Sequence, residues 1–223
     1  MKRISGMAFS LFLLLFSLSI SLFSVAYNTK GYRALQQELK IEEATGKTRQ
    51  ELDNINRDIV LYLQTGEPSL MTAHFGEREC AHMVDVYALF CFARVVCLVS
   101  AAGLSALLVA RYRDRNPQKM YVSWLVQALI FLLLAALSFF AMQSWQSVFT
   151  NFHHLFFRND LWILNVETDL MIQMMPEPFF MALAKGIAIH FVILSLLGQG
   201  VWMLAGKRFF SSERVMRKGE TNV

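Results

Sequence analysis

Charged residues are scarce in this 223-residue chain. They make up 17% of the sequence, whereas soluble globular domains carry about 25%. Hydrophobic residues reach 55%, and the mean hydropathy is +0.40. The shortage of charge argues against an ordinary soluble globule, and the high hydrophobic content argues against an intrinsically disordered chain.

Cysteines and familiar catalytic motifs are also few. The three cysteines, Cys80, Cys91 and Cys97, provide no disulfide framework. The sequence contains no H-E-x-x-H, C-x-x-C or G-x-S-x-G motif and no glycine-rich phosphate loop. Any chemistry of this protein must therefore come from residues outside these well-known patterns.

What the sequence does contain is four long apolar runs. They cover residues 7–27, 86–110, 120–145 and 179–206. About 20 apolar residues suffice for a helix to cross a bilayer, so we predict an all-α integral membrane protein with four transmembrane helices. Lys2 and Arg3 before the first run would also suit a secretory signal, but the run exceeds the roughly 7–15 residues of a signal core. We expect this first helix to be retained.

These runs define eight segments along the chain. We predict a first transmembrane helix with a cytoplasmic N-terminus (1–27), an extracytoplasmic helical cap (28–85), a second helix (86–110), a cytoplasmic turn (111–119), a third helix (120–145), an extracytoplasmic active-site loop rich in aromatic and histidine residues (146–178), a fourth helix (179–206) and a cytoplasmic basic tail (207–223).

The distribution of basic residues predicts the orientation. Eleven lysines and arginines lie in the N-terminus, the turn at 111–119 and the tail, whereas eight are spread over the two longer connecting segments. By the positive-inside rule both termini are cytoplasmic and the long segments lie outside. The net charge of +4 therefore reflects membrane topology and gives no indication of nucleic-acid binding.

The cap segment has a helical pattern. Thr48 to Glu51 forms a capping box. It precedes Leu52, Ile55, Ile59 and Leu63, which share one helix face. We predict a helix that packs its apolar face on the membrane-spanning helices or lies in the interface.

Histidines are the candidate proton carriers. His82 lies at the outer end of the second apolar run, between Glu79 and Asp85 at helical spacing. A neighbouring carboxylate can orient an imidazole and raise its basicity. The alternative is that these residues are merely solvated at a helix end.

The second connecting segment mixes aromatic residues with polar ones. It contains the sequences F-H-H-L-F-F-R-N-D-L-W (152–162) and M-P-E-P-F-F (175–180). An aromatic belt explains tryptophans at an interface, but not histidines and acids among them. We therefore predict a re-entrant or interfacial loop that lines a pocket. Arg94 and Lys185, the two charges within the spans, are further pocket candidates, with snorkelling to the interface as the alternative.

Together these motifs carry a resemblance. Four spans, an outer cap, E-x-x-H-M-x-D-V at 79–86, F-H-x-x-F-F-x-N-D-L-W and M-P-E-x-F-F occur in this order. The chain resembles the bacterial lipoprotein intramolecular transacylase family. The family pattern places its histidine at His153, directly after Phe152, although His154 follows immediately.

The resemblance implies an acyltransferase of the bacterial plasma membrane whose active site faces outward. It would act on diacylglyceryl-modified lipoproteins in membrane lipid, without cofactor or metal. It would move the sn-2 acyl chain to the α-amine of the same lipoprotein and leave a lyso-form. His82 and His153 would be the catalytic residues. Supporting residues would be Glu79, Asp85, Arg158, Asn159, Asp160 and Glu177, and pocket residues would be Phe156, Phe157, Trp162, Phe179, Phe180, Arg94 and Lys185.

Two other functions compete with this one. A non-catalytic membrane sensor or assembly factor could bind a partner through the cap. A metal or haem protein could use the histidines as ligands, although their spacing matches no zinc motif.

Overall fold

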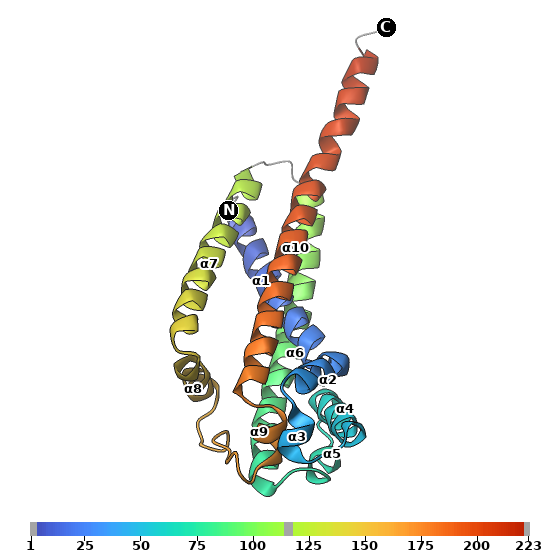
Figure 1. Ribbon diagram of the computed structural model, residues 1–223. Coiled ribbons are helices and arrows are strands. Elements are labelled where there is room, and N and C mark those ends of the chain that lie inside the picture. Colours follow the sequence, from blue (N-terminus) through green and yellow to red (C-terminus); the bar gives the residue numbers. More distant parts are fainter. Residues whose placement is uncertain (1–3, 114–117, 221–223) are drawn as a thin grey trace. The chain divides into compact units, whose positions relative to one another are not determined.

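The computed structural model describes residues 4–113 and 118–220. Within these ranges the chain forms ten helices and no strand (Figure 1). The long helices are α1 (Ile4–Ala26), α6 (Glu77–Arg113), α7 (Gln118–Gln143) and α10 (Glu177–Glu220). The short helices are α2 (Thr29–Glu38), α3 (Ile41–Thr45), α4 (Arg49–Thr65), α5 (Ser69–Thr72), α8 (Trp145–Phe156) and α9 (Leu170–Met174).

Among the described residues, three helices are long and apolar enough to cross a membrane. Their candidate spans are Ser5–Ala26 in α1, Glu77–Arg111 in α6 and Glu177–Ala205 in α10. In α7 the apolar stretch found among the described residues is shorter, Tyr121–Ala136. The prediction of four spans therefore stays a prediction. Leu98, Leu132 and Phe92 are 71%, 69% and 67% exposed, as expected of side chains that face lipid.

The helices differ from the expected segments at several boundaries. Helix α6 begins at Glu77 and so includes His82, and α10 runs through the predicted tail to Glu220. The segment 146–178 is also less of a loop than we expected, since it contains most of α8 and all of α9. The sequence explains α8: Ser144 accepts a hydrogen bond from the Ser147 N–H as an N-cap, and apolar residues recur at helical spacing from Trp145 onward.

The chain divides into two compact units. The first contains the N-terminal part of α1, the C-terminal part of α6, most of α7 and the C-terminal part of α10. Phe9 and Trp202 stack at its centre with ring centroids 4.0 Å apart. Gly103 allows close packing, because a Cβ atom there would lie 2.7 Å from the Phe12 ring. Within this unit Gln199 donates to the Ser123 hydroxyl at 2.9 Å.

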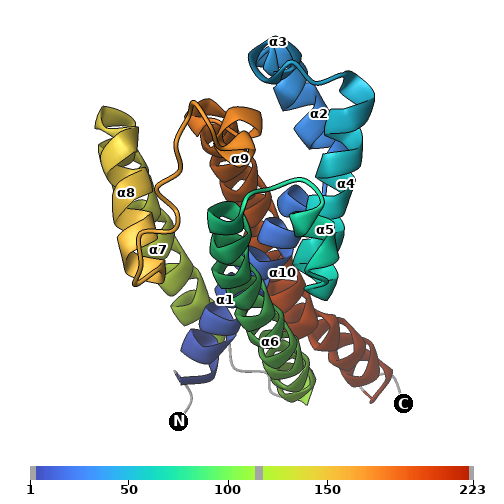
Figure 2. The same ribbon diagram turned by 90° about the horizontal axis from the view of Figure 1, so that it is seen from below.

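The second unit comprises Ser21–Val95 and Phe139–Ile189. Its helices α2 to α5 form the cap, which Figure 2 shows with α4 beside α5 and α2. The predicted stripe of α4 is confirmed, since Leu52, Ile55, Ile59 and Leu63 are all buried. They pack in one core with Met71, Met171, Met174 and Phe179. Helix α9 completes the cap by packing against α3.

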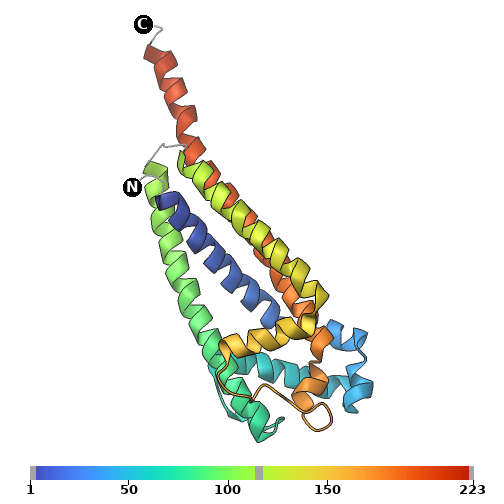
Figure 3. The same cartoon turned by 90° about the vertical axis from the view of Figure 1, so that its left-hand side faces the viewer.

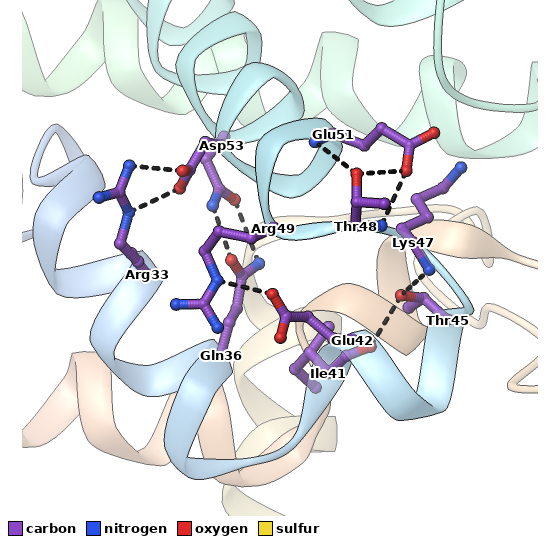
Figure 4. A network of polar contacts seen from close by, with 11 residues as sticks. Arg33, Gln36, Ile41, Glu42, Thr45, Lys47, Thr48, Arg49, Glu51 and Asp53 are labelled. Carbon is purple, nitrogen blue, oxygen red and sulfur yellow. Dashed lines mark hydrogen bonds and ion pairs between the residues drawn. The ribbon is translucent and has the colours of Figure 1, made fainter.

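Polar contacts fix the geometry of the cap (Figure 4). The predicted capping box is present, because the Thr48 side chain accepts from the Glu51 N–H and the Glu51 carboxylate accepts from the Thr48 N–H. Helix α4 ends where Gly66 adopts a left-handed conformation (φ 75°). Helices α2 and α4 are joined by a buried amide pair, in which Asn56 Nδ2 donates to Gln36 Oε1 at 2.7 Å.

Candidate active site

The two histidines selected from the sequence lie together in the second unit. His82 lies in the second turn of α6 and His153 in the last turn of α8, and the ring centroids are 6.1 Å apart. Both side chains are buried, with 8% of each residue exposed. Figure 3 shows α8 (gold) beside the N-terminal part of α6. His154 is exposed, and its ring meets Trp162 edge-on.

His153 has a defined tautomer. Its Nδ1 lies 2.7 Å from the carbonyl oxygen of Phe149, one turn earlier in α8. A carbonyl oxygen can only accept a hydrogen bond, so Nδ1 must carry the proton. In the neutral ring the free lone pair is therefore on Nε2.

The surroundings of His153 favour its neutral form. Burial lowers the pKa of His153, the hydrogen bond to the Phe149 carbonyl opposes this effect, and the neighbouring His154 lowers the pKa further. A buried imidazole that stays neutral near physiological pH keeps its lone pair available. A neutral imidazole with an available lone pair can accept a proton.

Aromatic rings surround the histidine pair. Phe157 lies 5.1 Å from the His82 ring and 5.6 Å from the His153 ring, measured between centroids. Trp162 stacks on His153 at 4.6 Å with an interplanar angle of 26°. Phe149 approaches the same imidazole to 4.2 Å. The pair therefore lies among aromatic rings.

Glu79 bonds to backbone groups. Its carboxylate accepts hydrogen bonds from the backbone N–H groups of Gly76 and Met171, both at 2.7 Å. Only 4% of the residue is exposed. Glu79 thus joins the first turn of α6 to α9 and fixes the helix one turn before His82.

Asp85 links α6 to the segment that follows α8. Its Oδ2 accepts a hydrogen bond from Asn159 Nδ2 at 2.8 Å, and Asn159 Oδ1 accepts from the Leu161 N–H. Arg78 donates to the backbone carbonyl of Asp160. These contacts hold residues 159–161 against α6, directly before the tryptophan that stacks on His153.

The other predicted site residues are more scattered. Phe180 lies 5.9 Å from Phe149 and so borders the histidine cluster. Phe179 is instead fully buried in the cap core, edge-on to Tyr32 at 5.3 Å. Phe156 is 48% exposed and contacts Phe152. Arg158, Glu177 and Lys185 are exposed.

Arg94 contacts the C-terminal end of α4 in the cap. One guanidinium nitrogen donates to the Leu63 carbonyl at 2.9 Å, and the group lies over the Tyr87 ring at 5.3 Å. Leu63 is in the last turn of α4, where carbonyls lack helical partners. Arg94 is therefore satisfied by the C-terminus of α4, which explains a charge this deep in an apolar run.

Two residues of the site were missed by sequence reasoning. Phe149 supplies both the carbonyl that fixes the His153 tautomer and a ring contact, and its position four residues earlier in a helix was the available signal. Met171 was undetectable, because it contributes a backbone N–H to Glu79 from 92 positions away.

Two buried polar atoms of the site lack hydrogen-bond partners among the described residues. They are His82 Nδ1 and Trp162 Nε1. Both belong to rings of the histidine cluster. Across residues 4–113 and 118–220, no group of three or more His, Cys, Asp or Glu residues is placed to hold a metal ion.

Fold and site together define a helical, membrane-integral protein with a buried histidine pair. A family model described as "Lipoprotein intramolecular transacylase Lit" matches residues 7–180. The chain belongs to this family, and it is therefore a membrane-integral acyltransferase. No curated protein matches the chain in sequence.

Solved structures share the fold of this chain. The membrane-integral lipoprotein intramolecular transacylase Lit from Bacillus cereus has the same fold, with a TM-score of 0.82, 21% identity and coverage of 95% of this chain and 98% of that chain. Two forms of that protein with one histidine replaced are also similar. Their TM-scores are 0.79 and 0.77, their identities 21% and 20%, and they cover 95% and 97% of this chain and 95% and 96% of theirs.

Proposed function

We propose that this enzyme moves the sn-2 acyl chain of a diacylglyceryl-modified lipoprotein to the α-amine of the same lipoprotein, and that His82 and His153 transfer the protons. Family membership supports the lipoprotein substrate. The observation that carries the mechanism is the pair of buried imidazoles whose centroids lie 6.1 Å apart.

His153 is the general base in this proposal. Its Nδ1 proton is held by the Phe149 carbonyl, so Nε2 is the atom that receives a proton. The attacking nitrogen must lose one proton when it becomes an amide. A neutral, buried imidazole with a fixed ring orientation suits this step.

His82 completes the transfer on the ester side. The amine lone pair forms the N–C bond at the ester carbonyl carbon, while the C=O electron pair moves to oxygen. His153 takes the nitrogen's proton and passes it to His82, directly or through a water molecule. The tetrahedral intermediate then collapses, the bond from carbon to the glyceryl oxygen breaks, and that oxygen takes the proton from His82. The pair returns to its starting charge, and the products are an amide and a free hydroxyl.

Confinement supplies much of the remaining catalysis. Donor and acceptor belong to one substrate molecule, so the site needs only to hold the amine and ester in contact. Phe157 and Trp162 flank the histidines and would enclose the glyceryl region. Holding reacting groups in the right geometry lowers the barrier by several kcal/mol.

The orientation proposed from the charge pattern places this chemistry on the extracytoplasmic face. Single cysteines introduced at Gly46 and Asp169 should react with an impermeant thiol reagent added outside the cells. A cysteine at Asn116 should react only after the membrane is permeabilised. Protection of the first two positions with external labelling of the third would reverse the topology.

Tandem mass spectrometry tests the activity. Protein reconstituted in bilayers should convert a diacylglyceryl lipopeptide into a form with one acyl chain on the amine and one on the glyceryl group. His82→Ala and His153→Ala should lose about 10²–10⁴-fold in rate. His154→Ala is the matched control and should stay active. If His154→Ala were inactive and His153→Ala active, the base would be His154 and the proposed assignment would be wrong.

A crossover experiment tests the intramolecular route. A lipopeptide with labelled acyl chains is mixed with an unlabelled one of different peptide mass. The label should remain on its own peptide. Label on the amine of the other peptide would require an acyl-enzyme or an exchange between substrates. Cys80→Ala should leave the rate unchanged, since the direct route needs no nucleophilic side chain.

A further inference from the structure

Trp162 has a polar atom that the free protein does not use. Its indole Nε1 is buried and has no hydrogen-bond partner among the described residues. The indole N–H is a donor and cannot accept a hydrogen bond. A buried donor without a partner lowers the stability of the free protein. Packing on His153 explains the aromatic ring, but it does not explain the buried N–H that has no partner among the described residues.

The donors expected from the sequence are less available. Asn159 gives its Nδ2 to Asp85, and its Oδ1 is taken by the Leu161 N–H. The Arg158 side chain is exposed, where water weakens any hydrogen bond it could offer to a substrate. Trp162 is half-buried, but its Nε1 is buried, and its ring stacks on His153 with centroids 4.6 Å apart. A substrate group held at the base is therefore also close to the indole.

We propose that Trp162 is a catalytic residue whose indole N–H stabilises the oxyanion of the transfer. This inference rests on the proposed function. As the amine attacks, the C=O electron pair moves to the carbonyl oxygen, and the N–H donates a hydrogen bond to that oxygen. No proton leaves the indole, and the interaction weakens again when the C=O bond re-forms. Donors placed in dry, preorganised sites stabilise such developing charge strongly.

The sharpest test replaces one atom. Incorporation of 3-benzothienylalanine at position 162 keeps the size and stacking of the ring but replaces N–H by sulfur. Loss of one oxyanion donor should lower kcat by about 10²-fold, with KM nearly unchanged. Trp162→Phe should lose kcat as well. Unchanged kcat with 3-benzothienylalanine would overturn the inference, and so would an effect confined to KM.

Trp145 provides the matched control. Its Nε1 is also buried and without a partner among the described residues, but the indole makes none of the ring contacts with the histidines described above. The same replacement at position 145 should leave kcat unchanged. An equal loss at both positions would mean that 3-benzothienylalanine harms the protein in general and would remove the support for an oxyanion donor.

A spectroscopic measurement separates this inference from the proposed function. A lipopeptide analogue with a phosphonate in place of the sn-2 ester mimics the oxyanion. Its binding should shift the indole N–H resonance of Trp162 downfield in ¹⁵N-labelled protein, also in His82→Ala, which does no chemistry. An unmoved resonance in protein that binds the analogue would overturn the role of Trp162. Full activity of both histidine variants would instead overturn the proposed function.

Discussion

The cap and the histidine site use buried polar groups in opposite ways. In the cap, Gln36 and Asn56 are buried and bond to each other, and Gln36 also reaches the Met174 carbonyl at 3.4 Å. In the site, His82 Nδ1 and Trp162 Nε1 are buried without partners among the described residues. Satisfied groups stabilise and specify a fold, whereas unsatisfied ones lower stability and remain available to a ligand.

Removing the histidine pair should give the largest effect and should leave the fold intact. His82→Gln and His153→Gln should each reduce the rate by about 10²–10⁴-fold. The double variant should be hardly worse than either single one, because residues that act as a unit are not additive. The measurement is the rate of lyso-form production, with circular dichroism as the folding control. Multiplicative losses would show that the two imidazoles act separately.

Breaking the amide pair of Gln36 and Asn56 should lower stability and leave the activity of the folded protein intact. Asn56→Leu leaves the buried Gln36 amide unpaired and should cost about 1–3 kcal/mol of stability. Thermal unfolding in detergent measures this loss, and the folded fraction should keep its activity. The double variant Gln36→Leu, Asn56→Leu should regain part of the stability, because neither amide is left alone. A double variant less stable than Asn56→Leu would show that the pair is not a closed unit.

Changing the burial of His153 should alter its titration. Burial lowers the pKa of His153, so its neutral form persists below the ordinary histidine pKa of about 6.5. Trp162→Ala removes the stacked ring, admits water and should raise the pKa of His153. Chemical shifts of ¹³C-labelled histidine against pH measure this, with His153→Gln identifying the resonance. If Trp162→Ala did not change the titration midpoint of His153, another contact would be responsible for its lowered pKa.

The smallest effect should come from the capping box. Thr48→Ala removes an N-cap and should cost about 1 kcal/mol. The rate of acyl transfer should be unchanged, because the box lies in the cap. Thr72→Ala, at an exposed position of α5, is a comparison that should alter neither stability nor rate. A fall in rate for Thr48→Ala at full stability would connect the cap to the chemistry.

Local patterns predicted much of this molecule. The stripe of α4, its capping box and the apolar runs depend on residues close in sequence, and all appear as helices. The two histidines came from motifs at the ends of such runs. The partners of Glu79 and Arg94 could not be predicted, because a backbone N–H or carbonyl leaves no trace in the sequence. Helix α8 was missed because its apolar face was interpreted as the lining of a loop.

The contact between Glu79 and the Met171 N–H also constrains the order in which the site can be completed. The two residues are 92 positions apart, so the anchor of His82 does not exist until that length of chain has followed it. Contacts of such large sequence separation form late, since the loop-closure entropy must first be overcome. In a partly synthesised chain, Glu79 has only its local contact with the Gly76 N–H. Glu79 can join α6 to α9 only after Met171 has been synthesised.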